Sequence, residues 1–154
     1  MSSQDIVDLG WLSGDAGEEP TGQRLASTLR DVVAMQRELG EVYLRISAGP
    51  EADRLAGGWH RESGYPLPGL PAWPLRAEPW WPAGQTTWIA RQLVQYSYLL
   101  SDDTHPWLLV GTVVGRGPDC EPLIADFTHV AHVAAGVMPE AQSVYAGWRA
   151  REFR

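Results

Sequence analysis

Residues 66–82 restrict the fold more than any other part of this sequence. They hold six prolines and three tryptophans: Pro66, Pro68, Pro71, Pro74, Pro79, Pro82, Trp73, Trp80 and Trp81. Because proline fixes φ and has no backbone donor, this Trp/Pro segment cannot form a helix or a central strand. We predict a stiff, extended segment in which only residues 72–75 could add a strand, at the edge of a sheet.

The tryptophans of the Trp/Pro segment are candidates for contact with a ligand. Flat indole faces on a stiff backbone stack on planar rings at little cost in conformational entropy. The alternative is that these indoles fill the core above the helix that follows, since Trp is mostly buried in folded proteins.

The residues before this segment predict one helix, one strand and a long connection. Apolar residues recur at helical spacing over residues 25–39, and Gly40 follows as a terminator. Residues 41–47 alternate polar and bulky side chains, which is typical of a strand. Residues 48–71 show no period and carry five glycines, which in a compact domain indicates a functional or mobile loop.

The residues after the segment predict two helices around a hairpin. A helix begins at Thr86 or Thr87 and runs to about residue 100, with Ile89 and Leu93 in its apolar stripe. Residues 107–114 form a central strand. Turn residues 115–119 connect it to a hairpin partner over residues 121–127, and extended chain follows at residues 130–134. The last helix starts at Pro139, a residue favoured in the first helical turn.

Together these elements predict an α+β domain with a mainly antiparallel sheet of four to six short strands and about three helices. We expect residues 1–20 to form a flexible acidic tail and residues 21–154 to form a single domain. A cleft should lie between the Trp/Pro segment, the end of the first strand and the hairpin turn.

Charge and length exclude several functions. The 154 residues suffice for one ordinary domain. A formal charge of −7 has the wrong sign for binding nucleic acid or anionic lipid. The N-terminus shows no secretory signal and no stretch is apolar enough to span a membrane, so we expect a cytoplasmic monomer or homodimer.

Three residues are candidates for catalysis: Arg45, Glu121 and His60. Arg45 and Ser47 lie two apart on the first strand and face the same side, where the guanidinium could hold an anion. The alternative for Arg45 is a partly buried ion pair. Glu121 follows the hairpin turn, where a carboxylate could act as a base or bind a ribose hydroxyl, and His60 could transfer a proton. Candidate substrate contacts are Ser47, Trp73, Trp80, Trp81, Arg91, Tyr96 and Arg116.

Two histidines have the spacing of a metal pair on a helix. His129 and His132 are three residues apart, but Val130 and Val133 favour a strand, on which positions of odd difference face opposite sides. We therefore predict no metal site and no bound cofactor, and NAD enters only as a candidate substrate.

Several stretches resemble an uncharacterised family of small actinobacterial proteins. They lie at residues 42–50, 67–70, 78–81 and 114–123, and the resemblance implies no activity. The order of elements is also similar to the NAD-binding fold of ADP-ribosyltransferases. That similarity implies a dinucleotide-binding role for Arg45 and a catalytic role for Glu121, although the family's serine-containing middle strand has no counterpart here.

The leading hypothesis is a small enzyme that acts on a nucleotide-like or other planar polar molecule, as a transferase or glycohydrolase using NAD. A second hypothesis is a non-catalytic binding or protein-interaction module that uses the Trp/Pro segment. A third is an accessory enzyme of small-metabolite biosynthesis, with acid–base chemistry at His60 or His105.

Overall fold

The computed structural model describes residues 24–59 and 63–153, and its fold is the predicted α+β class. The tail predicted at residues 1–20 lies outside the described residues. The elements, in chain order, are β1 (Leu25–Ala26), α2 (Leu29–Leu39), β2 (Tyr43–Ser47), α3 (Pro50–Ala56), β3 (Gly58–Trp59), β4 (Pro66–Leu67), β5 (Leu70–Pro71), β6 (Trp73–Pro74), α4 (Gln85–Gln95), the 3-10 turn η1 (Ser97–Leu99), β7 (His105–Arg116), β8 (Pro122–Val133) and α5 (Val137–Glu152).

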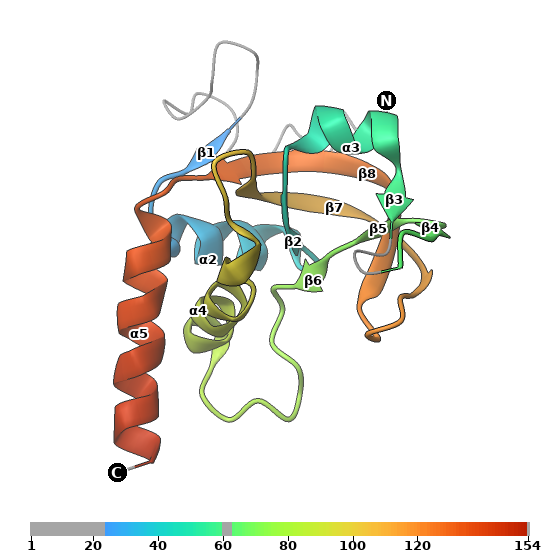
Figure 1. Ribbon diagram of the computed structural model, residues 1–154. Helices are drawn as coiled ribbons and strands as arrows, with labels where there is room; N and C mark the ends of the chain where they lie inside the picture. The colour runs from blue at the N-terminus through green and yellow to red at the C-terminus, as the bar shows by residue number, and fades with distance from the viewer. Residues whose placement is uncertain (1–23, 60–62, 154) are drawn as a thin grey trace.

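The main sheet is mostly antiparallel and curls on itself (Figure 1). Its strand order is β1-β8-β7-β2-β6, and the predicted hairpin is the β7–β8 pair. The edge strand predicted at residues 72–75 is β6, which pairs with β2. Only Ala72 separates β6 from β5, and β5 pairs with β8. Pro71 and Pro74 thus belong to the two short strands that connect β8 with β2 and close the sheet into a ring.

Two hydrophobic clusters use opposite faces of this sheet. The larger cluster lies between the sheet and helices α2, α4 and α5, and includes Leu44, Leu108, Ile89 and Leu93. The smaller cluster fills the ring and contains Tyr43, Leu70, Ala72, Trp107, Leu109 and Ile124. Alternation along β2 and β7 sends successive side chains to the two clusters. Helix α3 lies on the side of β7 and β8 away from α4 and α5 (Figure 1).

The first helix begins later than the periodicity predicts. Leu25 and Ala26 form β1, which pairs in parallel with the end of β8. Helix α2 starts after Thr28, whose side chain accepts a hydrogen bond from the Asp31 backbone, while the Asp31 carboxylate accepts one from the Thr28 backbone. This capping box sets the helix start, and it overrides the apolar pattern that extends to Leu25.

The prediction of an unstructured connection over residues 48–71 is wrong. Pro50 occupies the first turn of α3, and three short strands follow the helix. The glycines allow close approach of backbones: a Cβ on Gly58 would lie 2.1 Å from the Gly69 carbonyl oxygen, and one on Gly69 would lie 2.8 Å from the Ile124 nitrogen. The missing side chain of Gly58 therefore lets β3 approach Gly69, and that of Gly69 lets this part of the chain pack directly on β8.

The other helices differ from prediction at their ends. Helix α4 begins at Gln85 with Gly84 as its N-cap, and it ends at Gln95 before η1. Helix α5 begins at Val137, two residues before Pro139. Over residues 24–59 and 63–153, no helix is both long and apolar enough to cross a membrane.

Candidate functional site

A pocket of about 800 Å³ lies between the Trp/Pro segment, α4 and the tip of the β7–β8 hairpin. Six large aromatic side chains line it: Trp59, Trp73, Trp80, Trp88, Tyr96 and Tyr98. Its charged lining residues are Arg45, Glu78, Arg91, Arg116, Asp119 and Glu121. The volume falls in the range of small-molecule sites, which are typically about 300–1,000 Å³. We call this hollow the aromatic pocket.

Arg91 projects from α4 into a group of indoles. Its guanidinium carbon lies 5.0 Å from the ring centroid of Trp88, 5.6 Å from that of Trp81 and 5.8 Å from that of Trp80. Its Nη1 donates to Gln92 Oε1 at 3.0 Å. Within the part of the chain that the structure describes, no carboxylate forms an ion pair with Arg91. The guanidinium is therefore held in place by π faces and keeps donors for an incoming anion.

Tyr96 stacks on Trp73 at the end of α4. The two ring centroids are 3.9 Å apart and the planes are inclined by 15°. Burial raises the pKa of the Tyr96 hydroxyl, the Arg91 charge lowers it, and the carboxylates of Glu121 and Asp119 raise it further. The phenol is thus within electrostatic reach of a cation on α4 and of two carboxylates on the hairpin.

Arg45 lines the aromatic pocket, but its guanidinium is already occupied. It donates from Nε and Nη2 to both carboxylate oxygens of Asp53, at 2.7 and 3.2 Å, and from Nη1 to the Pro71 carbonyl at 2.7 Å. This arrangement is the ion pair that the sequence left open as an alternative, and it corrects the picture of Arg45 as an anion-binding residue. Arg45 joins β2, α3 and β5.

Ser47 and Trp81 are not part of the pocket lining. The Ser47 hydroxyl is buried, donates to Asp53 at 2.7 Å and accepts from the Trp107 indole at 2.9 Å. The Trp81 indole donates to the Gly84 carbonyl at 3.0 Å and contacts Trp148. Both residues therefore make structural contacts within the fold. His60 lies outside the described residues.

Glu121 and Arg116 lie at the hairpin tip, on the rim of the pocket. Glu121 Oε1 accepts a hydrogen bond from the Asp119 backbone at 2.9 Å, and Gly117 leaves room for this carboxylate, since a Cβ there would lie 2.2 Å from Oε2. Arg116 Nη1 donates to the Cys120 carbonyl at 3.3 Å. The turn thus orders one carboxylate and leaves most of the Arg116 donors unused by the described residues.

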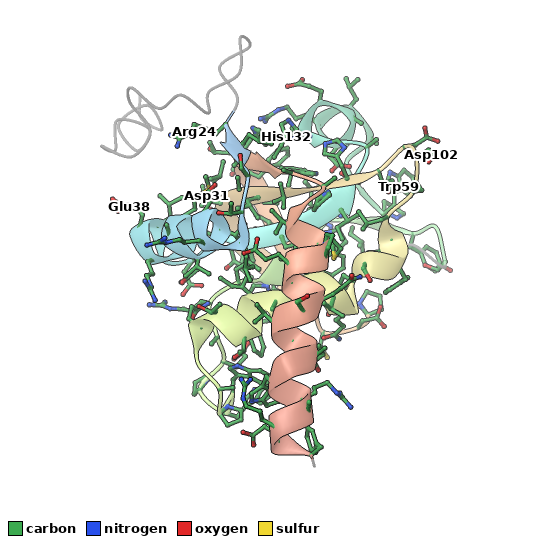
Figure 2. All side chains as sticks on the ribbon, turned by 90° about the vertical axis from the view of Figure 1, so that its left-hand side faces the viewer. Arg24, Asp31, Glu38, Trp59, Asp102 and His132 are labelled. Atoms are coloured by element: carbon green, nitrogen blue, oxygen red, sulfur yellow. The ribbon has the colours of Figure 1, made fainter. Side chains whose placement is uncertain are left out.

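The pocket also contains residues that the sequence did not single out. Trp88 and Gln92 both donate to the Pro74 carbonyl, at 3.0 and 2.9 Å, and fasten the Trp/Pro segment to α4. Their spacing of four residues was the available signal, because it places them on one helix face. Trp59 enters from β3, and Figure 2 shows it with Asp102 on the same side of the molecule, away from Glu38.

A row of histidines lies on the ring side of the sheet. On β8, His132 pairs with Trp107 of β7, and His129 pairs with Leu109. One residue separates Trp107 from Leu109 on β7, whereas two residues separate His129 from His132 on β8. The extra residue is a bulge, so both histidines face the same side, contrary to the prediction. The His132 ring centroid lies 4.6 Å from that of His129 and 5.0 Å from that of His105. No metal-binding group of three or more ligands occurs among the described residues.

Because of the histidine row, we expect the free energy of unfolding to fall as the pH is lowered. Burial, with the nearby charges of His132, Arg54 and His105, lowers the pKa of His129 to about 4. The unfolded chain binds this proton at about pH 6.5 and the folded chain only near pH 4, so protonation favours unfolding as the pH falls through that window. We expect His129→Gln to flatten the dependence of unfolding free energy on pH between 6.5 and 4. The unfolding free energy at each pH can be measured by urea titration. The same slope of this free energy against pH in the variant and in the wild type would contradict the prediction.

Comparison with known proteins gives a family and no activity. No curated protein and no solved structure matches the chain. The comparisons therefore give no support to an actinobacterial source or to similarity with ADP-ribosyltransferases. The predicted membership of an uncharacterised family is confirmed, because residues 20–153 match the model of a family of unknown function. The chain belongs to this family, DUF6098.

Proposed function

We propose that the chain binds a small, planar, anionic molecule of the nucleotide type in the aromatic pocket. The observation that carries this proposal is the Arg91 guanidinium, placed over three indoles without a carboxylate partner among the described residues. An unpaired guanidinium in a partly desolvated site binds phosphate or carboxylate through charge-assisted hydrogen bonds.

The aromatic side chains of the pocket lining supply stacking surface for the planar group, and two of them are largely exposed. Trp80 is 62% exposed and Trp59 is 51% exposed, and both line the pocket. Stacking of a nucleobase on an aromatic side chain is worth about 1–3 kcal/mol. A ring on these faces would bring an attached anion within the hollow that contains Arg91.

Ligand-induced stabilisation tests the binding proposal. At a concentration 100 times its Kd, a bound nucleotide adds about 2.7 kcal/mol to the free energy of unfolding, which raises the Tm by roughly 5–10 °C for a domain of this size. We expect such a shift with at least one of AMP, nicotinamide mononucleotide and NAD in differential scanning fluorimetry. No shift with any of them at millimolar concentration would contradict the proposal.

Two matched variants assign the binding to Arg91. Arg91→Gln should weaken nucleotide binding by roughly tenfold or more, because charged hydrogen bonds contribute about 1.5–3 kcal/mol. Arg149→Gln is the control, since Arg149 also lies over aromatic rings, those of Tyr145 and Phe153, but outside the pocket. Equal effects of the two substitutions on the Kd would show that binding does not use Arg91.

We further propose Glu121 as the catalytic carboxylate if bound NAD is hydrolysed. Glu121 lines the pocket, where its carboxylate can stabilise positive charge on the ribosyl carbon as the bond to nicotinamide breaks. Nicotinamide leaves with the bonding electrons, and water adds to the ribosyl carbon and loses a proton. At saturating NAD, Glu121→Gln should slow nicotinamide release at least roughly a hundredfold. Wild-type protein that binds NAD without releasing nicotinamide would exclude this step.

A further inference from the structure

We infer that the aromatic pocket selects a dipolar ligand, one whose planar ring is cationic and whose anionic group is separate from the ring. This inference rests on the proposed binding function and specifies the class of ligand. It follows from the unequal distribution of charge between the α4 side and the hairpin side of the pocket.

The α4 side of the pocket is cationic. Arg91 approaches from the helix and is embedded in indole faces. Glu78 also lines the pocket, but it belongs to the Trp/Pro segment and not to α4, and no ion pair joins it to Arg91 among the described residues. Arg45 adds no net charge because Asp53 neutralises it. An anionic group is therefore favoured beside α4.

The hairpin side of the pocket is acidic. Asp119 and Glu121 both line it, and Arg116 is the one cation that this hairpin contributes to the lining. Two carboxylates against one guanidinium leave a net negative charge at the hairpin tip. Both carboxylates raise the pKa of the Tyr96 hydroxyl, and the Arg91 charge lowers it. Tyr96, which lines the pocket, is therefore within electrostatic reach of both charged sides.

Stacked aromatic side chains also line the pocket. The Trp73 and Tyr96 rings stack at 3.9 Å, and both belong to the pocket lining. Aromatic faces attract cationic groups through their quadrupole, and the attraction grows when water is excluded. A cationic ring at this position would gain from the π faces and from the hairpin carboxylates, while its anionic substituent would reach toward Arg91.

Three related probes separate the contribution of the ring charge to binding from that of the phosphate. Nicotinamide mononucleotide has a pyridinium cation and a phosphate. Nicotinamide riboside keeps the cation and lacks the phosphate, whereas reduced nicotinamide mononucleotide keeps the phosphate and has a neutral ring. We expect isothermal titration calorimetry to give the dipolar nucleotide a Kd at least roughly fivefold lower than either of the others, the effect of about 1 kcal/mol per charge contact.

Variants assign each preference to one side of the pocket. Arg91→Gln should remove the preference for the nucleotide over the riboside. The double variant Asp119→Asn, Glu121→Gln should remove the preference for the oxidised over the reduced nucleotide, and Arg149→Gln should leave both preferences unchanged. Circular dichroism and the Tm of each variant verify that it is folded, and Arg91→Lys, which keeps the charge, should retain part of the first preference.

The outcomes distinguish this inference from the function on which it rests. Equal or tighter binding of the reduced nucleotide, or of AMP, would overturn the dipolar preference and leave the binding of planar anions intact. Equal binding of the riboside would overturn it as well. If none of these compounds binds, the proposed function fails and the inference fails with it.

Discussion

Asp53→Asn should lower the free energy of unfolding by about 3 kcal/mol, the lower end of the range for breaking a buried ion pair. The substitution leaves the Arg45 guanidinium, whose side chain is 16% exposed, without its anion, while the Asp53 side chain itself is 9% exposed. It also removes a charged acceptor from the Ser47 hydroxyl. For a domain of this length, the expected fall in Tm is roughly 6–12 °C.

A surface ion pair provides the matched control. Glu41 and Arg76 also form a carboxylate–guanidinium contact, but their side chains are 57% and 58% exposed. Glu41→Gln should therefore cost less than about 1 kcal/mol. Equal destabilisation by the two substitutions in urea titrations would mean that the contacts of Asp53 do not anchor α3 to the sheet.

Gly69→Ala should be similarly damaging, for a steric reason. The added Cβ would lie 2.8 Å from the Ile124 nitrogen and 2.9 Å from its carbonyl carbon and oxygen. All three are backbone atoms of β8, so no side chain can rotate away. Overpacking costs about 1–3 kcal/mol where side chains can adjust, and we expect at least about 3 kcal/mol here. Because β5 leads directly into β6, the aromatic pocket should also be distorted.

Gly136→Ala controls for the loss of a glycine. Gly136 has helical φ and ψ of −69° and −13°, and a Cβ there meets no heavy atom within 4 Å. Its replacement should change the free energy of unfolding by less than about 0.5 kcal/mol. If Gly69→Ala were equally mild, close stacking of β5 on β8 would not be a requirement of the fold.

The features that sequence predicted well are those set by local chemistry. Continuous apolar residues and turn residues predict the β7–β8 hairpin, and proline confines β6 to an edge. The features that it missed depend on partners distant in the chain. β1 forms because Leu25 pairs with His132 of β8. Gly58 is needed because its backbone lies against Gly69, and Gly69 is needed because its backbone lies against Ile124. The histidine row depends on a bulge whose position the sequence does not mark.

The sequence predicted part of the candidate site, because it shows residue types but not their distant partners. Seven of the residues named from sequence line the pocket: Arg45, Trp73, Trp80, Arg91, Tyr96, Arg116 and Glu121. Which guanidinium has a carboxylate partner could not be read from sequence, because Asp53 belongs to a helix that periodicity did not predict. Arg45 has a carboxylate partner and Arg91 has none among the described residues, and this difference depends on the positions of α3 and of the indoles.

A crystal structure of the protein with nicotinamide mononucleotide tests the central claim most directly. We predict the phosphate within about 3.2 Å of an Arg91 guanidinium nitrogen, the limit of a good hydrogen bond, and the ring against the aromatic faces near Tyr96. A nucleotide bound elsewhere on the protein, or one in the pocket whose phosphate points away from Arg91, would contradict the claim.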